Sequence, residues 1–157
     1  MAIFKIGEFI NMAIKDEQTG EAFYRALAET SNTETVKNGL VTIADQERNH
    51  TERFQKLLAD VGEETPKEEY DGQYAKYLNV LLTNHAFPTS EAAAKKASEL
   101  TNDYEGLMMS LHLEKDALLF YEEIRRMLPD THKAIVADII NEERVHLEDL
   151  IVLADNL

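Results

Sequence analysis

The feature that most constrains the fold of this sequence is a short motif, Glu-x-x-His, that occurs twice. Glu143 and His146 form one copy, and Glu47 and His50 form the other, 96 residues earlier. In a helix, residues three apart lie on one face about one turn apart. Each copy can therefore direct one carboxylate and one imidazole at the same point.

A second repeat lies at an offset of 97 residues. Glu17 is followed seven residues later by Tyr24, and Glu114 is followed seven residues later by Tyr121, with a phenylalanine before each tyrosine. The two repeats together predict two helix pairs of the same design, which carry four glutamates and two histidines. Such a set is typical of a dinuclear metal site inside a four-helix bundle.

Apolar residues recur at helical spacing in four long segments. We expect helices from about Ile6 to Glu29, from a cap at Ser31 to about Val61, from a cap at Asn102 to the residue before Pro129, and from a cap at Asp130 onward. In each segment the glutamates and histidines of the repeats interrupt the apolar stripe near mid-helix. An unpaired charge there would be strongly unfavourable.

Metal ions remove this electrostatic cost. Four carboxylates buried together must share protons or bind cations, and two divalent ions would balance their charge. A lone Glu-x-x-His pair is more often exposed, but two copies within apolar stripes favour a metal site. Carboxylate and imidazole ligands without thiolate suit two iron ions, with manganese or zinc as alternatives. The candidate metal ligands are Glu17, Glu47, His50, Glu114, Glu143 and His146.

Several neighbouring residues allow two interpretations. Tyr24 and Tyr121, our candidate catalytic residues, either donate hydrogen bonds to carboxylates near the metals or only fill the core. Glu21 is either a further ligand or a group behind the ligands, and we favour the second. Gly20 costs about 1 kcal/mol relative to alanine in mid-helix. Either a group beside it needs space, or two helices approach closely there.

The remaining histidines and Glu142 are weaker candidates. His85, His112 and His132 lack carboxylate partners at ligand spacing, so we expect them to be surface or packing residues. Glu142 is rotated by about 100° from Glu143 on a helix. It is therefore the poorer ligand of the two.

The segment from Glu63 to Thr89 is predicted to be a long crossover. Tyrosines and leucines recur at helical spacing between Tyr70 and Leu82, which predicts a short amphipathic helix, and a second helical stretch runs from Ser90 to about Leu100. A connection of this length lets the second and third long helices run parallel. We therefore predict a single all-α domain over residues 1–157, a four-helix bundle whose long crossover contains short helices.

The composition excludes several function classes. The chain of 157 residues has no cysteine, which excludes disulfides, zinc–thiolate sites, iron–sulfur clusters and thiol catalysis. A formal net charge of −14 argues against partners such as nucleic acid or an anionic membrane surface. Charged residues interrupt the apolar N-terminal stretch, and no stretch approaches the length of a membrane span. We expect a cytoplasmic protein.

The paired motifs resemble the di-iron carboxylate domain of the rubrerythrin and ferritin-like superfamily, over essentially the whole chain. The resemblance implies a ferritin-like bundle. It also implies that Glu47 and Glu143 bridge two metals, that Glu17 and Glu114 are terminal carboxylates, and that His50 and His146 each bind one metal. Two departures are notable. Ala117 stands where rubrerythrins often have a further glutamate, and this sequence lacks the cysteines of a rubredoxin domain.

The resemblance implies an oxidoreductase that reacts with a small oxidant, hydrogen peroxide or oxygen. Two alternatives are the uptake and oxidation of iron for storage or detoxification, and a structural metal-bound bundle. Because the chain has no cysteine, it has no thiol or iron–sulfur relay of its own. We therefore expect an external electron donor protein, and we expect the chain to form a homodimer.

Overall fold

The computed structural model describes residues 4–66 and 70–157, and every regular element in this part of the chain is a helix. Residues 1–3 and 67–69, which belong to the predicted domain and crossover, lie outside the described residues. The elements in chain order are α1 (Ile6–Thr30), α2 (Glu34–Val61), α3 (Gly72–Thr83), α4 (Ser90–Glu99), α5 (Asp103–Met127), the 3-10 turn η1 (Asp130–His132) and α6 (Lys133–Asp155).

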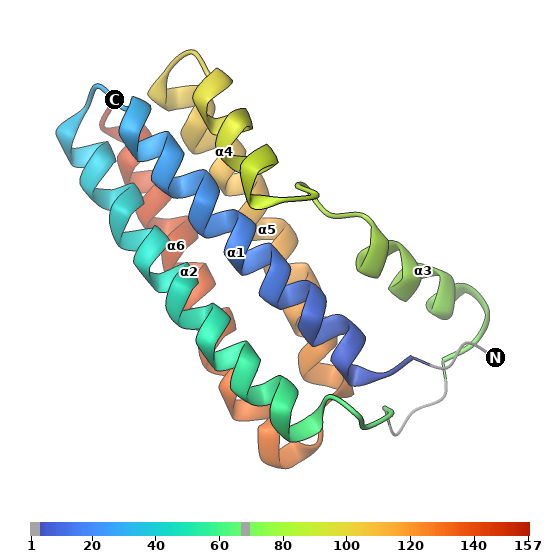
Figure 1. Cartoon of the computed structure of the whole chain (residues 1–157). Helices are drawn as coiled ribbons and strands as arrows, with labels where there is room; N and C mark the ends of the chain where they lie inside the picture. Colours follow the sequence, from blue (N-terminus) through green and yellow to red (C-terminus); the bar gives the residue numbers. More distant parts are fainter. Residues whose placement is uncertain (1–3, 67–69) are drawn as a thin grey trace.

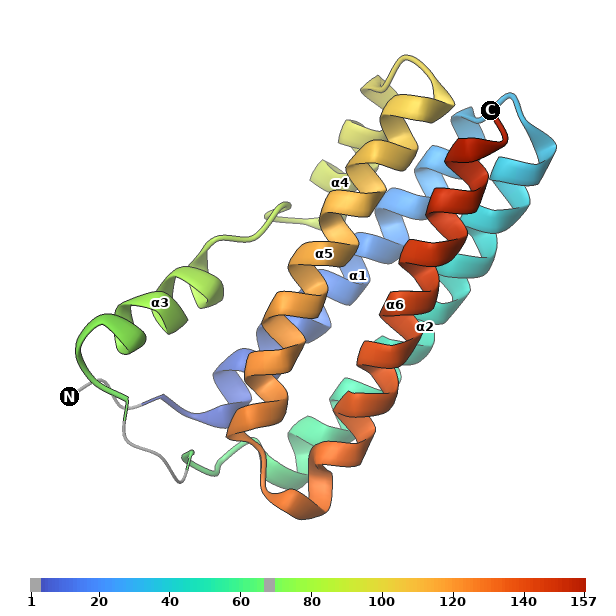
Figure 2. The same cartoon turned by 180° about the vertical axis from the view of Figure 1, so that it is seen from behind.

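Four long helices form the bundle. α1 and α2 make one antiparallel pair, α5 and α6 make the other, and the pairs meet through α1 with α5 and α2 with α6 (Figure 1). α2 and α5 run in the same direction, because the crossover returns the chain to the end of the bundle where α2 began (Figure 2). The predicted all-α four-helix bundle with one long crossover is confirmed.

The crossover contains both predicted short helices. α4 packs along α1, whereas α3 lies toward the opposite end of the bundle (Figure 2). Leu78 of α3 is fully buried. None of the described helices has both the length and the apolar character that a membrane crossing requires.

The ends of the helices follow the predicted caps with two exceptions. Asn102 caps α5 as expected, since its Oδ1 accepts a hydrogen bond of 2.9 Å from the Glu105 backbone N–H. Thr33, not Ser31, directly precedes α2, because the Ser31 hydroxyl accepts a hydrogen bond from the Thr33 N–H within the loop. Asp130 begins a 3-10 turn, so His132 and not Asp130 caps α6, and the helix starts two residues later than predicted.

The apolar core has two halves. One contains Ile10, Phe54, Phe120 and Ile139, and the other contains Phe23, Leu40, Leu107 and Leu150. Along every long helix, the residues of one half precede the predicted ligands and those of the other half follow them. The bundle therefore positions these glutamates and histidines in one layer between two apolar clusters.

Candidate metal centre

The six predicted ligands come together in this layer. Glu17, His50, Glu143 and His146 are 0% exposed, Glu114 is 2% exposed and Glu47 is 5% exposed. α1 and α5 each contribute one glutamate, and α2 and α6 each contribute one Glu-x-x-His pair. The two sequence repeats thus place ligand-type side chains from four helices around one point.

The cluster divides into two overlapping groups. Glu17, Glu47, His50 and Glu143 form one group, and Glu47, Glu114, Glu143 and His146 form the other. Within each group, one potential ligand atom per residue lies within 4.8 Å of all the others. Glu47 and Glu143 belong to both groups, which is the arrangement that two neighbouring cations with shared carboxylates require.

Each histidine directs its Nδ1 atom into the cluster. Nδ1 of His50 lies 3.1 Å from Oε1 of Glu143 and 3.4 Å from Oε2 of Glu17. Nδ1 of His146 lies 2.7 Å from Oε2 of Glu143 and 3.2 Å from Oε1 of Glu47. Glu143 therefore lies between the two imidazoles, with one oxygen toward each.

Most of the atoms at the centre of the cluster have no hydrogen-bond partner. They are Oε2 of Glu17, Oε1 of Glu47, both carboxylate oxygens of Glu143, and Nδ1 of His50 and His146. Buried polar atoms are rarely left unsatisfied, because each one costs about 1–3 kcal/mol. Here all six are ligand-type atoms that converge on one place. A pair of divalent cations fits this donor set and would satisfy the unpaired atoms.

A second ring of contacts holds the histidines. Nε2 of His50 lies 2.8 Å from Oε2 of Glu142, which also receives a hydrogen bond from Arg53. Nε2 of His146 lies 2.7 Å from Oε1 of Gln46. Since both partners present acceptor oxygens, each Nε2–H donates, and each Nδ1 would present its lone pair to a bound cation.

The sequence analysis missed this role of Gln46 and Glu142. The signal was present, because both residues directly precede the glutamate of a Glu-x-x-His copy, at the same offset of 96 residues. Each supports the histidine of the other copy, so α2 and α6 exchange supporting residues across the bundle. Helical periodicity correctly placed Glu142 outside the stripe that faces the cluster, but it did not predict the contact of Glu142 with His50.

The two tyrosines also cross between helices. Tyr24 of α1 donates a short hydrogen bond to Oε1 of Glu114 on α5, and Tyr121 of α5 donates one of 2.5 Å to Oε1 of Glu17 on α1. Burial and the neighbouring carboxylates raise the pKa of both hydroxyls well above the ordinary value for tyrosine. Both therefore remain protonated donors, which agrees with the first of the two interpretations of these residues.

The electrostatics of the cluster are those of crowded, buried carboxylates. The pKa values of Glu17, Glu47 and Glu114 are all raised, mainly by burial and next by the charge of nearby glutamates. The pKa of Glu114 is raised to about 8. Burial alone would raise the pKa of Glu143 too, but the close approach of His50 and His146 lowers it overall. Glu143 is thus the carboxylate held most firmly in its charged form.

The histidines respond in the opposite sense. Burial by itself lowers the pKa of an imidazole, but nearby carboxylates outweigh it and raise the pKa of His50 to about 11 and that of His146 to about 10. The metal-free cluster therefore holds protons on its imidazoles and on some of its carboxylates. These protons occupy the place of the positive charge that cations would supply.

The structure gives the surroundings of Glu21 and Gly20, whose roles the sequence left open. Oε1 of Glu21 accepts hydrogen bonds from Arg25 at 2.8 Å and from Arg48 at 2.6 Å, so Glu21 faces two guanidinium groups and is not part of the cluster. A Cβ atom at Gly20 would lie 2.9 Å from Oε2 of Glu47. The glycine therefore makes room for a carboxylate of the cluster.

The other three histidines lie outside the two groups of potential ligands. His112 is exposed. His132 has Nδ1 2.9 Å from the Thr131 hydroxyl. Two of them lie near carboxylates that the sequence spacing did not indicate: Nδ1 of His85 is 2.8 Å from Oδ2 of Asp16, and Nε2 of His132 is 3.8 Å from Oδ2 of Asp60.

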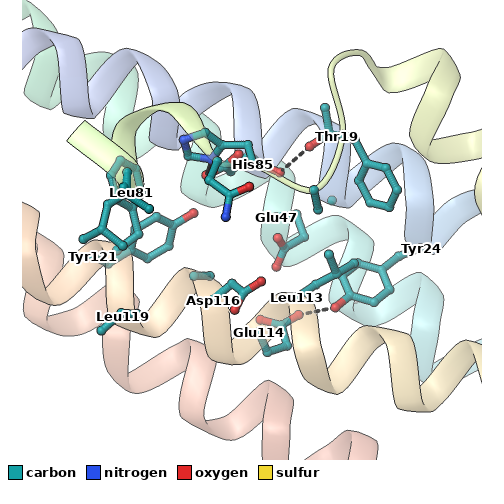
Figure 3. A pocket seen from close by; sticks show the side chains of 18 residues that line it. Thr19, Tyr24, Glu47, Leu81, His85, Leu113, Glu114, Asp116, Leu119 and Tyr121 are labelled. Atoms are coloured by element: carbon teal, nitrogen blue, oxygen red, sulfur yellow. Dashed lines mark hydrogen bonds and ion pairs between the residues drawn. The ribbon is translucent and has the colours of Figure 1, made fainter. Parts of the chain in front are cut away.

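A cavity of about 210 Å³ lies beside the cluster. Its wall is formed by α1, α5 and the end of α3 with the segment that follows, and Glu47 and Glu114 reach it from the cluster (Figure 3). Tyr24, Tyr121 and His85 also line it. A small molecule in this cavity would be next to the carboxylates that face the cluster centre.

Comparison with known proteins agrees with this geometry. A ferritin-like diiron-carboxylate candidate from Thermotoga maritima superposes with a TM-score of 0.74 at 26% identity, over 99% of this chain and 97% of that one. A hypothetical protein from Pyrococcus furiosus gives a TM-score of 0.67 at 22% identity, over 97% and 89% of the two chains. The manganese catalase KatB from Anabaena shares the fold, with a TM-score of 0.67 at 20% identity, over 99% of this chain and 75% of that one.

The comparisons by sequence identify the family. No curated protein matches the chain, whereas the family model for rubrerythrin matches residues 8–154. This match confirms the resemblance that the paired motifs indicated, and it includes residues of all four long helices and every residue of the cluster. The chain therefore belongs to the rubrerythrin family.

Proposed function

We propose that this protein is a dinuclear metal oxidoreductase that reduces hydrogen peroxide with electrons from outside the chain. The observation that carries the proposal is the convergence, within one layer of the bundle, of six buried ligand-type atoms that have no hydrogen-bond partner. A structural site would need no opening, but the cavity beside Glu47 and Glu114 gives a small molecule a place next to these carboxylates.

The residues have distinct roles in this proposal. Glu47 and Glu143 would hold both cations, since each belongs to both groups of potential ligands. Glu17 with His50, and Glu114 with His146, complete one position each. Iron is the proposed metal, in line with the diiron description of the Thermotoga protein, and manganese is the alternative. A bound pair of iron ions would supply the two-electron redox chemistry.

The surrounding residues orient the ligands and supply protons. Tyr24 and Tyr121 hold one oxygen of Glu114 and of Glu17, so the other oxygen of each carboxylate is free to face the cluster centre. Reduction of peroxide to water consumes protons as well as electrons. Tyr24 and Tyr121 both line the cavity, and we propose that their hydroxyl groups supply protons to a molecule bound there.

Electrons must arrive from another molecule, because the chain contains no cysteine for a thiol or iron–sulfur relay. We propose an external electron-transfer protein or reductase as the donor, and a homodimer as the assembly. Size-exclusion chromatography tests the assembly directly, since a dimer elutes far from both a monomer and a cage.

Stopped-flow absorbance tests the proposed reaction. The protein is loaded with Fe(II) without oxygen and mixed with hydrogen peroxide or with oxygen-saturated buffer. We expect single oxidation that is much faster with peroxide, and continued turnover only when an electron donor is added. Accumulation of many ferric ions per chain under oxygen would indicate iron storage instead, and lack of oxidation by either would indicate a structural metal site.

A further inference from the structure

The cavity beside the cluster is larger than hydrogen peroxide requires. Its volume is about 210 Å³, and an apolar protein cavity of about 150 Å³ is sufficient to bind benzene. Peroxide is far smaller than a benzene ring. The volume therefore matches a molecule that contains one six-membered ring.

The cavity wall combines an apolar middle with a polar inner end. Leu81, Phe87, Leu113 and Phe120 contribute apolar and aromatic surface. The buried Glu47 and Glu114 lie at the inner end, whereas exposed residues such as Asn84 and Asp116 mark the open side. Figure 3 shows Glu47 and Glu114 extending into the same space from facing helices. A ligand that fits must therefore have an apolar body and a polar group.

The charge of the wall restricts that polar group. Four carboxylates line the cavity, those of Asp16, Glu47, Glu114 and Asp116. Among the described residues no lysine or arginine lines it, and His85 already faces Asp16 at 2.8 Å. Carboxylates accept hydrogen bonds and repel anions. A hydrogen-bond donor such as a hydroxyl therefore suits this wall, and anionic molecules are disfavoured.

We propose that the cavity binds a neutral, hydroxyl-bearing, single-ring aromatic molecule, a phenol or hydroquinone, and that a hydroquinone bound there is a source of the electrons for peroxide reduction. The electron-donor half rests on the proposed function, whereas the binding half does not. The hydroquinone loses two electrons and its two hydroxyl protons and becomes a quinone. Peroxide gains them, its O–O bond breaks, and two water molecules form.

Binding is tested with phenol as the probe, on metal-free and zinc-loaded protein, by isothermal titration calorimetry. Benzoate, an anionic molecule of similar size, is the comparison ligand. We expect saturable phenol binding to both forms of the protein, and binding of benzoate weaker by about tenfold or more. Absence of saturable phenol binding, or equal affinity for benzoate, would overturn the proposal.

Two substitutions locate the phenol. Ala117 lines the cavity from α5 and Ala86 lines it from the segment after α3, so Ala117→Phe and Ala86→Trp should each weaken phenol binding by about tenfold or more. Ala59→Phe on the exposed side of α2 is the matched control and should bind phenol normally. Ala86 lies outside the helices, so its replacement still tests the site if Ala117→Phe does not fold. Unchanged binding to a folded cavity variant would place the phenol elsewhere.

Proximity and electron donation need their own measurements. With Mn(II)-loaded protein, the ring protons of phenol should relax faster in the presence of wild-type protein than with Ala117→Phe. With iron-loaded protein, hydroquinone and peroxide should yield quinone, seen by its absorbance, and Ala117→Phe should slow this turnover by a larger factor than it slows single oxidation by peroxide, because the ring needs more of the cavity than peroxide does. Phenol binding without quinone formation would disprove the electron-donor half, even if peroxide oxidises the iron-loaded protein.

Discussion

His50 on α2 and Glu142 on α6 are 92 positions apart in the chain but in direct contact, with Nε2 of the imidazole 2.8 Å from Oε2 of the carboxylate. Gln46 and His146 make the reciprocal contact at 2.7 Å. The two contacts are not equivalent, because Glu142 is charged and is bound by Arg53, whereas Gln46 is neutral. The two metal positions that we propose are therefore supported by different groups.

The first prediction concerns this support. Glu142→Ala removes the acceptor that orients His50, so metal affinity should fall by about 10–100-fold, as is usual for groups behind a metal-bound histidine. Gln46→Ala should affect the position that includes His146. Glu148→Ala, an exposed glutamate on the same helix, is the control and should leave affinity unchanged. Titration with Fe(II) or Co(II), followed by absorbance, measures the effect. Equal affinity of Glu142→Ala and wild type would contradict the assigned role.

Much of this centre could be predicted from the sequence, because a charged residue inside an apolar helical stripe has to face the interior of the bundle. That reasoning predicts that Glu17 and His146 are buried, although it does not say which residues surround them. It does not identify the contact of His50 with Glu142, because periodicity fixes the face of a helix and not what that face meets. The cavity could not be predicted from the sequence either, because it depends on where the segment after α3 returns to the bundle.

The two interpretations of Gly20 show the same limit. The sequence indicated that something close to Gly20 excludes a larger residue from this mid-helix position. Only the packing of α1 against α2 shows that the excluding group is Oε2 of Glu47. Likewise, the hydroxyl of Ser31 was a sound candidate for a helix cap. A competing hydrogen bond within the loop, from the Thr33 N–H to Ser31, decided otherwise.

The second prediction is stoichiometric. The two overlapping groups should bind about two divalent ions per chain, measured by metal analysis after anaerobic loading. Loading should also raise the melting temperature by roughly 5–10 °C when free metal is about a hundred times Kd, because binding stabilises only the folded state. Saturation at one ion, or equal melting temperatures of the loaded and metal-free protein, would argue against a buried dinuclear site.

The third prediction uses Gly20. Gly20→Ala should raise the stability of the metal-free protein by up to about 1 kcal/mol through helix propensity. Its Cβ would also displace Oε2 of Glu47, so metal affinity should fall. Gly39→Ala is the matched control, since its new Cβ would meet the side chain of Leu153 and not the cluster. Urea unfolding and metal titration measure the two effects separately. A Gly20→Ala protein that binds metal as tightly as Gly39→Ala would contradict the proposed role of the glycine.

The fourth prediction concerns pH. In the metal-free protein the pKa of Glu114 is about 8, and those of His50 and His146 are about 11 and 10. These groups therefore hold protons between pH 6 and 8 that metal ions must displace, so metal affinity should rise with pH. The expected slope is about tenfold per pH unit for each proton released. Calorimetry in buffers of different ionisation enthalpy counts the protons, and an affinity independent of pH would rule out a protonated cluster.

The fifth prediction separates the two tyrosines. Tyr24→Phe removes the hydrogen bond to Glu114 and Tyr121→Phe removes the one to Glu17, so each should weaken the support of one metal position. We expect metal affinity or the rate of oxidation by peroxide to fall by about 10–100-fold in each variant. Tyr104→Phe, an exposed tyrosine on α5, should have no effect.

The two variants should also differ from each other. Because Glu114 lies in the group with His146 and Glu17 lies in the group with His50, Tyr24→Phe should perturb only the first group and Tyr121→Phe only the second. NMR spectra of the zinc-loaded protein, labelled with ¹⁵N at histidine, report on the two imidazoles separately. If both variants shift the same imidazole, or neither shifts one, the assignment of one tyrosine to each metal position is wrong.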